Sequence, residues 1–329
     1  MAAQKQRPTA PQSPSGARPK GKGRSGNPAA RPYEKIRPAT FGDWVAGARV
    51  FTLSMSISPV LVGTGAATVA NDPGEFHWVR ALLCLVIAVS LQIGVNYAND
   101  YSDGIRGTDR HRVGPFRLVG SGRAKPKTVL IVALAFFGVA AVAGIVLTVI
   151  TGLWWLIAVG AVAILAGWFY TGGRRPYGYN ALGELFVFVF FGLVATLGTA
   201  YVQSFTLNQE AWLGAVGVGL IAVATLIVNN IRDIAQDEEA GKRTLTVLLG
   251  GRASRALYIV CVLAPFGIAV WLAFFYPIAW FALFGLLAAL PAVIIVATAR
   301  SAKEFVLALK LTGLVQLLYG LALLWAFWK

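Results

Sequence analysis

The chain has 329 residues, of which 57% are hydrophobic and only 13% are charged, and its formal net charge is +15 at pH 7. A soluble domain carries about 25% charged residues, so this composition excludes an ordinary soluble globular protein. Apolar runs long enough to cross a hydrocarbon core recur along the chain, which predicts an all-α, polytopic membrane protein.

The first 38 residues differ in composition from everything that follows. Residues 1–38 are rich in Pro, Gly, Ser, Lys and Arg and contain a single acid, Glu34. So few large aliphatic side chains cannot bury enough apolar area to offset the ordering entropy, so we expect a disordered basic tail. No apolar run follows its charges, which argues against a cleaved signal peptide. We expect the tail to contact anionic lipid head groups rather than nucleic acid, because no folded nucleic-acid-binding module accompanies it.

Residues 39–329 are expected to form one membrane domain. The apolar runs predict nine transmembrane segments around a central cavity. These segments cover residues 46–70, 79–99, 128–149, 153–170, 181–203, 211–231, 256–275, 277–298 and 305–327. Two of the joins, at Thr151-Gly152 and at Tyr276-Pro277, leave very tight turns, and the proline favours a break over one continuous helix.

Basic residues are unevenly distributed between the two ends of these segments. Outside the tail, nearly all Lys and Arg fall in four connecting loops, at residues 100–127, 171–180, 232–255 and 299–304. The opposite side has Arg80 and Lys329. By the positive-inside rule the four loops and the N-terminus face the cytoplasm, and the asymmetry supports a count of nine segments.

Two short acidic clusters stand at the ends of otherwise charge-poor segments, at residues 96–103 and 229–237. Residues 95–100 (VNYAND) line up without a gap on residues 228–233 (VNNIRD). Four predicted segments lie between the two clusters, and an even number restores the orientation. The pattern therefore predicts two four-helix pseudo-repeats in parallel orientation plus one further helix, with the acidic clusters facing one cavity.

Each cluster places two aspartates on one face of a helical end. Asp100 and Asp103 are three residues apart, and Asp233 and Asp237 are four apart. Carboxylates at membrane depth are costly, and four that face each other repel unless cations meet them. Mg²⁺ prefers oxygen ligands and completes its shell with water and phosphate oxygens, so the pattern favours a site for Mg²⁺ and a lipid diphosphate. The alternative is that these acids only pair with nearby arginines at a wet interface.

The motifs also resemble those of a known family. NDxxD at residues 99–103 and RDxxxD at residues 232–237 resemble the two signature motifs of the UbiA superfamily of intramembrane prenyltransferases, and the likeness runs from about Trp44 to the C-terminus. Within that superfamily, four stretches are similar to the branch that prenylates 1,4-dihydroxy-2-naphthoate in menaquinone biosynthesis. These stretches are residues 98–109, 114–117, 170–179 and 229–245.

This resemblance implies an activity, a cofactor and a location. The expected reaction moves a polyprenyl group from polyprenyl diphosphate to 1,4-dihydroxy-2-naphthoate, with loss of CO₂ and diphosphate, and gives demethylmenaquinol. The expected cofactor is Mg²⁺, held by Asp100, Asp103, Asp233 and Asp237 as the catalytic metal ligands. The expected location is the bacterial plasma membrane, with the active site on the cytoplasmic side.

The resemblance also implies which side chains bind the two substrates. The candidate diphosphate-binding residues are polar or basic side chains beside the motifs: Asn96, Asn99, Arg106, Arg117, Asn230, Arg232 and Lys242. The candidate acceptor-binding residues are Arg49, Thr52, Tyr170, Arg174, Tyr177, Tyr179 and Glu184. In other superfamily members a YxxxK motif falls near Tyr170, but here Arg174 stands where the lysine is expected. An arginine at that position can pair with a carboxylate or a phosphate through two hydrogen bonds.

Other functions stay open on the sequence. A prenyltransferase of the 4-hydroxybenzoate, haem or chlorophyll type would share the aspartate motifs. A secondary transporter would also have repeats and acids, but these acids are expected near the middle of broken helices rather than at helix ends. A CDP-alcohol phosphotransferase also uses carboxylates and a metal, but its DGxxAR-type signature does not occur in the sequence.

Overall fold

A computed structural model describes residues 37–72, 75–107 and 117–328, and its regular elements there are all helical, without a β-strand. The elements are α1 (Phe41–Gly47), η1 (Val50–Thr52), α2 (Ser54–Ala70), α3 (Trp78–Arg106), α4 (Pro126–Thr151), α5 (Leu156–Phe169), η2 (Tyr177–Tyr179), α6 (Gly183–Val187), the π-helix η3 (Phe188–Val194), α7 (Ala195–Ser204), α8 (Gln209–Glu239), α9 (Leu245–Ala273), η4 (Pro277–Gly285), α10 (Leu286–Thr298) and α11 (Ala302–Phe327). The predicted tail falls almost wholly outside the described residues, as does part of the loop 100–127.

The predicted all-α, multi-pass architecture is confirmed. Seven helices in the described part of the chain are long and apolar enough to cross a membrane, and eight if one bent pair counts as a single span. That pair joins Phe41–Thr52 to Ser54–Ala70 at an angle of 46°. Helix α5 is apolar but has only 14 residues. Each predicted segment overlaps one or more helical elements, and the count of nine transmembrane helices stays a prediction.

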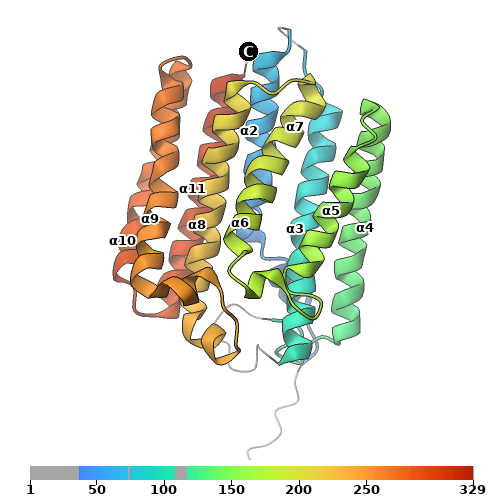
Figure 1. Cartoon of the computed structure of the whole chain (residues 1–329), viewed down its shortest axis with the longest axis vertical. Helices are drawn as coiled ribbons and strands as arrows, with labels where there is room; N and C mark the ends of the chain where they lie inside the picture. Colours follow the sequence, from blue (N-terminus) through green and yellow to red (C-terminus); the bar gives the residue numbers. More distant parts are fainter. Residues whose placement is uncertain (1–36, 73–74, 108–116, 329) are drawn as a thin grey trace, which may run out of the picture. The chain divides into compact units, whose positions relative to one another are not determined.

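Helix α8 lies at the centre of the described bundle. It is the most buried of the candidate spans, with 72% of its apolar window inside the protein. It packs against α2, α9 and α11, and their buried side chains form the main apolar core. Figure 1 shows α3 and α8 running in the same direction, toward the lower end of the view, where the segment between α5 and α6 also lies. The two acidic clusters therefore end at the same side of the bundle.

Both acidic clusters are themselves helical. Helix α3 continues past its apolar segment to Arg106 and ends where Gly107 adopts a positive φ of 74°. Helix α8 continues to Glu239, and Gly241 turns the chain with a φ of 71°. Glycine tolerates this left-handed conformation without the steric cost that other residues bear. The aspartates of each cluster consequently lie on the last turns of a rigid helix, as the spacing predicts.

A π-helix joins α6 to α7. Over Phe188–Val194 the chain is wound more widely than an α-helix, and this stretch packs against α8. Gly192 makes the contact, because a Cβ atom there would lie 2.7 Å from the Cα of Gly219. Short π-helical stretches are frequent at functional sites. This one turns Phe190 and Phe191 toward a cavity described below.

Candidate active site

Asp100 holds the polypeptide segment that crosses the end of α3. Its side chain is fully buried, and its two carboxylate oxygens accept hydrogen bonds from the backbone N–H groups of Leu118 (2.8 Å) and Val119 (3.0 Å). Gly104 allows the close approach, since a Cβ there would lie 2.3 Å from the Val119 side chain. The predicted metal ligand Asp100 therefore also positions Arg117, the residue next to this pair of amides.

Asp103 and Asp237 meet at one lysine. The Nζ atom of Lys242 lies 3.6 Å from an oxygen of Asp103, on α3, and 3.8 Å from an oxygen of Asp237, on α8. Arg117 lies 3.7 Å from the other oxygen of Asp103. All four side chains are almost fully buried. The predicted convergence of the two clusters thus holds for this pair of aspartates.

Asp233 is paired within its own helix. Arg232 donates to both of its carboxylate oxygens at 2.7 Å and to Oδ1 of Asn229 at 2.9 Å. The Arg232 side chain is only 1% exposed. Such a two-pronged, buried arginine–carboxylate pair fixes the orientation of both groups. Arg232, predicted to bind diphosphate, therefore neutralises a predicted metal ligand in this structure.

The loop between α5 and α6 is fastened to the end of α3. The guanidinium group of Arg106 donates to the backbone carbonyls of Thr171 and Gly173. The hydroxyl of Thr171 donates to Oδ1 of Asn99 at 2.6 Å. Arg106 also lies over the ring of Tyr179, 5.5 Å from its centroid. These contacts make the loop a wall of the site rather than a free connection.

Tyr179 links this loop to the aspartates. Its hydroxyl donates to Asp103, and its ring faces the Lys242 ammonium at 4.6 Å. Burial and the adjacent carboxylate of Asp103 raise the pKa of the Tyr179 hydroxyl, which keeps it protonated as a donor. Its backbone carbonyl accepts the N–H of Arg243 at 2.9 Å, which ties the loop to the segment after α8.

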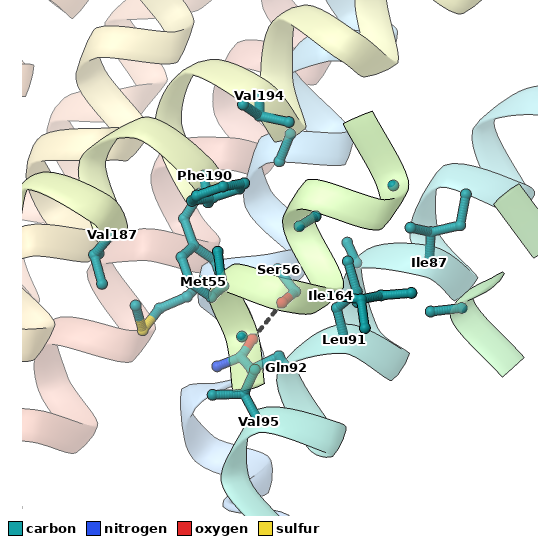
Figure 2. Close-up of a pocket in the computed structure, with 18 of the residues that line it drawn as sticks. Met55, Ser56, Ile87, Leu91, Gln92, Val95, Ile164, Val187, Phe190 and Val194 are labelled. Atoms are coloured by element: carbon teal, nitrogen blue, oxygen red, sulfur yellow. Dashed lines mark hydrogen bonds between the residues drawn. The ribbon is translucent and has the colours of Figure 1, made fainter. Parts of the chain in front are cut away.

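An elongated cavity of about 480 Å³ begins beside these groups and extends into the bundle. At one end its lining is polar and includes Arg49, Asn96, Asn99, Arg117 and Asn229. The remainder is lined mainly by apolar side chains of α2 to α5 and of α6 to α7. Figure 2 shows part of this lining, with Phe190 and Met55 facing Leu91 and Ile164 across the space. A cavity with one polar, cationic end and a long apolar part suits a lipid that carries an anionic head group.

The candidate acceptor-binding residues divide into three groups. Arg49, Thr52, Tyr170 and Tyr177 line the cavity. Tyr179 lies at Asp103 instead, and the buried Glu184 accepts a hydrogen bond from Asn230 at 3.1 Å. Arg174 is exposed and lies outside the cavity lining. The structure thus does not bring Arg174, the residue in place of the expected lysine, together with the others.

The two candidate asparagines of α3 line the cavity, whereas Asn230 does not. Asn96 donates to the backbone carbonyl of Ala48 at 3.0 Å, and Asn99 accepts from Thr171. On α8 it is the preceding residue, Asn229, that lines the cavity. The gap-free alignment of the two clusters pairs Asn229 with Asn96, so the sequence alone could have identified Asn229 in place of Asn230.

Sequence reasoning also missed a polar group deeper in the cavity. Ser56 donates to Oε1 of Gln92, and the Gln92 amide nitrogen donates to the backbone carbonyl of Thr52 at 2.8 Å. Figure 2 shows the contact between Ser56 and Gln92 at the cavity wall. Gln92, Asn96, Asn99 and Asp103 follow helical spacing on α3, so a polar stripe in the sequence could have identified Gln92.

Comparison with known proteins assigns the chain to a family. A model of the UbiA prenyltransferase family matches residues 56–312. The chain belongs to this family. It is 47% identical over 289 residues to a 1,4-dihydroxy-2-naphthoate octaprenyltransferase of Mycobacterium tuberculosis, with 86% of this chain and 96% of the relative covered. It is 38% identical to a relative of the same name from Escherichia coli, with 78% and 83% covered.

Solved structures of UbiA proteins share the fold. A UbiA homologue from Archaeoglobus fulgidus bound to GPP and Mg²⁺ superposes with a TM-score of 0.59 at 13% sequence identity, and the match covers 86% of this chain and 99% of that one. The same homologue bound to DMAPP and Mg²⁺ gives a TM-score of 0.58 at 12% identity. At such low identity the likeness establishes the helical architecture.

The residues at the ends of α3 and α8 fit a magnesium ion that is shared with a substrate. Within the described residues no three acidic, histidine or cysteine side chains form a ready-made metal cage. Mg²⁺ sites of phosphate-handling enzymes normally use one or two carboxylates, and substrate oxygens and water complete the octahedron. Asp103 and Asp237 provide two carboxylates that already hold a common cation, the ammonium group of Lys242. These carboxylates therefore have the right chemistry to hold a Mg²⁺ ion in this UbiA protein.

Proposed function

We propose that this protein transfers a polyprenyl group from polyprenyl diphosphate to 1,4-dihydroxy-2-naphthoate, with release of diphosphate and CO₂, to give demethylmenaquinol. The observation that carries the proposal is the meeting of both aspartate clusters at Lys242, beside the polar end of an apolar cavity. The similarity to 1,4-dihydroxy-2-naphthoate octaprenyltransferases, which extends over 86% of the chain, supports this acceptor over the 4-hydroxybenzoate, haem and chlorophyll-type alternatives.

The polar end of the cavity holds the diphosphate. Bound Mg²⁺ supplies positive charge that stabilises the leaving diphosphate as the C–O bond breaks. We assign the four aspartates to the metal site: Asp103 and Asp237 would hold the ion, while Asp100 and Asp233 would complete the site and orient Arg117 and Arg232. Lys242 and Arg117 would pair with oxygens of the diphosphate.

The apolar part of the cavity holds the prenyl chain and protects the allylic cation. The aromatic side chains Phe190, Tyr170 and Tyr177 line it, and their ring faces stabilise a nearby positive charge. The scarcity of polar groups keeps out water, which would convert the cation to an alcohol. A ring carbon of the acceptor forms the new C–C bond, and its carboxyl group leaves as CO₂.

The acceptor occupies the junction between the two parts of the cavity. Arg49 lines the cavity and provides a cation for the carboxylate of the acceptor. Thr52 and Gln92 offer hydrogen bonds to the hydroxyl groups of the acceptor. The bend between α1 and α2 places Arg49 there, in a left-handed conformation with a φ of 55°. A non-glycine residue in this conformation is uncommon and marks a position that the surrounding structure determines.

We also propose that the active site and the N-terminus face the cytoplasm in a bacterial plasma membrane. Basic residues concentrate in the loops at the end of the bundle that carries both aspartate clusters, including Arg106, Arg174 and Lys242. The positive-inside rule supports this orientation.

An acceptor panel tests the proposed reaction. Purified protein in liposomes, given polyprenyl diphosphate and Mg²⁺, is expected to prenylate 1,4-dihydroxy-2-naphthoate and to leave 4-hydroxybenzoate unchanged, as read by mass spectrometry of the lipid extract. EDTA is expected to abolish the product, and added Mg²⁺ to restore it. Turnover of 4-hydroxybenzoate alone would disprove the acceptor assignment, and full activity in EDTA would disprove the metal requirement.

A further inference from the structure

Lys242 is held in place by the turn that follows α8. Gly241 reverses the chain with a φ of 71°, and the backbone N–H of Lys242 then donates to the backbone carbonyl of Asp237 at 2.8 Å. The side chain consequently runs back along the last turn of α8 toward α3. The same aspartate contacts Lys242 twice, through its carbonyl and through its carboxylate.

The ammonium group is surrounded by groups that attract a cation. Besides Asp103 at 3.6 Å and Asp237 at 3.8 Å, the ring of Tyr179 lies 4.6 Å from Nζ. The Lys242 side chain is only 11% exposed. A buried ammonium is costly unless opposite charges accompany it, so these contacts strongly favour this position of the side chain.

A divalent cation held between Asp103 and Asp237 would occupy the two carboxylates that the ammonium now contacts. We propose that the Lys242 ammonium and Mg²⁺ compete for Asp103 and Asp237, and that metal and diphosphate therefore bind cooperatively. A metal ion that takes the two carboxylates releases the ammonium, which then pairs with oxygens of the diphosphate. This inference builds on the metal–diphosphate site of the proposed function and adds a coupling between its two ligands.

Because of this coupling, removal of the Lys242 ammonium is expected to change the affinities for metal and for diphosphate in opposite directions. Without the lysine, the metal has no competitor, so its affinity in the absence of diphosphate rises. The diphosphate loses a cationic partner, so its affinity at saturating metal falls. Coupling between two ligands is typically about 5- to 150-fold. A lysine with a merely structural role would change both affinities in the same direction.

Two binding measurements on the full-length protein in detergent test the inference. Mn²⁺ affinity is read from the EPR signal of the free ion, and inorganic pyrophosphate affinity is read by equilibrium dialysis at saturating Mg²⁺. For Lys242→Met we expect about tenfold tighter Mn²⁺ binding and about tenfold weaker pyrophosphate binding. Arg243→Met is the matched control, because it removes the same charge from the next residue, whose side chain is exposed. It is expected to change either affinity by less than about twofold.

Three results would overturn the inference: unchanged or weaker Mn²⁺ binding by Lys242→Met, unchanged pyrophosphate binding by that variant, or equal effects in Arg243→Met. Lys242→Gln keeps a polar side chain and provides the same comparison should the methionine variant fail to fold. Neither measurement uses the aromatic acceptor, so a wrong acceptor assignment leaves the result intact. Conversely, prenyl transfer without this pattern of affinities would retain the proposed function and remove the coupling.

Discussion

Asp237→Asn is expected to lower kcat/KM for prenyl transfer by at least about 100-fold while the protein stays folded. Asparagine has nearly the same shape as aspartate, but it removes one of the two carboxylates that meet at Lys242. Its amide cannot replace that charge as a ligand for Mg²⁺. The measurement is steady-state prenyl transfer at saturating Mg²⁺, with the melting temperature as the check on folding.

Glu238→Gln is the matched control for this substitution. Glu238 follows Asp237 on α8, and its side chain is exposed. The change again replaces a carboxylate with an amide of nearly the same shape, and activity is expected to stay within about twofold, because an exposed charge is screened by solvent and salt. Near-normal activity of Asp237→Asn, or an equal loss in both variants, would contradict the assignment of Asp237 to the metal site.

Arg232→Met is expected to destabilise the protein strongly. Its guanidinium group donates to both oxygens of the buried Asp233 and is itself 1% exposed. Removal of one partner of a buried ion pair costs about 3–5 kcal/mol, because the remaining charge loses its counter-charge. The melting temperature of the variant in detergent or liposomes measures this loss.

The double variant Arg232→Met, Asp233→Asn separates stability from catalysis. Removal of both charges is expected to restore most of the melting temperature, since no uncompensated charge remains at this position. Activity is expected to stay at least about 100-fold below that of the unaltered protein, because Asp233 contributes to the metal site. A double variant that regains both stability and activity would show that this pair serves the fold alone.

Much of the fold follows from the sequence because one physical constraint dominates. Backbone groups in a hydrocarbon core must be paired internally, so long apolar runs become helices. The two tight joins are also predicted correctly: Gly152 ends α4 with a φ of 72°, and Pro277 begins a new element. The break near Arg49 was not predicted, because the apolar run continues through it and tertiary contacts determine the bend.

The helix ends were harder to predict than the helices. The second cluster lies on a helix that extends eight residues past the expected end, from 231 to Glu239. Helix α9 begins at Leu245 rather than near 256, with a break at Gly250. Outside the hydrocarbon, hydropathy no longer constrains the chain, so capping residues and local contacts decide where a helix begins and ends.

The site was predictable in its acidic groups and less so in their partners. The repeated spacing pointed to four aspartates because carboxylates are rare in this chain. The partners of these aspartates depend on loops that approach from elsewhere. Lys242, after the end of α8, contacts Asp103 on α3, and Tyr179 comes from the loop before α6. Spacing along one chain does not encode such distances, so the sequence predicts Arg174 in the site although this residue lies outside the cavity lining.

Release of labelled CO₂ tests the central claim most directly. Purified protein in liposomes is given Mg²⁺, polyprenyl diphosphate and 1,4-dihydroxy-2-naphthoate that carries ¹⁴C in its carboxyl group. The proposed reaction predicts labelled CO₂ and unlabelled prenylated product in equal amounts, with both formed at least about 100-fold more slowly by Asp237→Asn. A prenylated product that keeps the label, or labelled CO₂ without prenylated product, would contradict it.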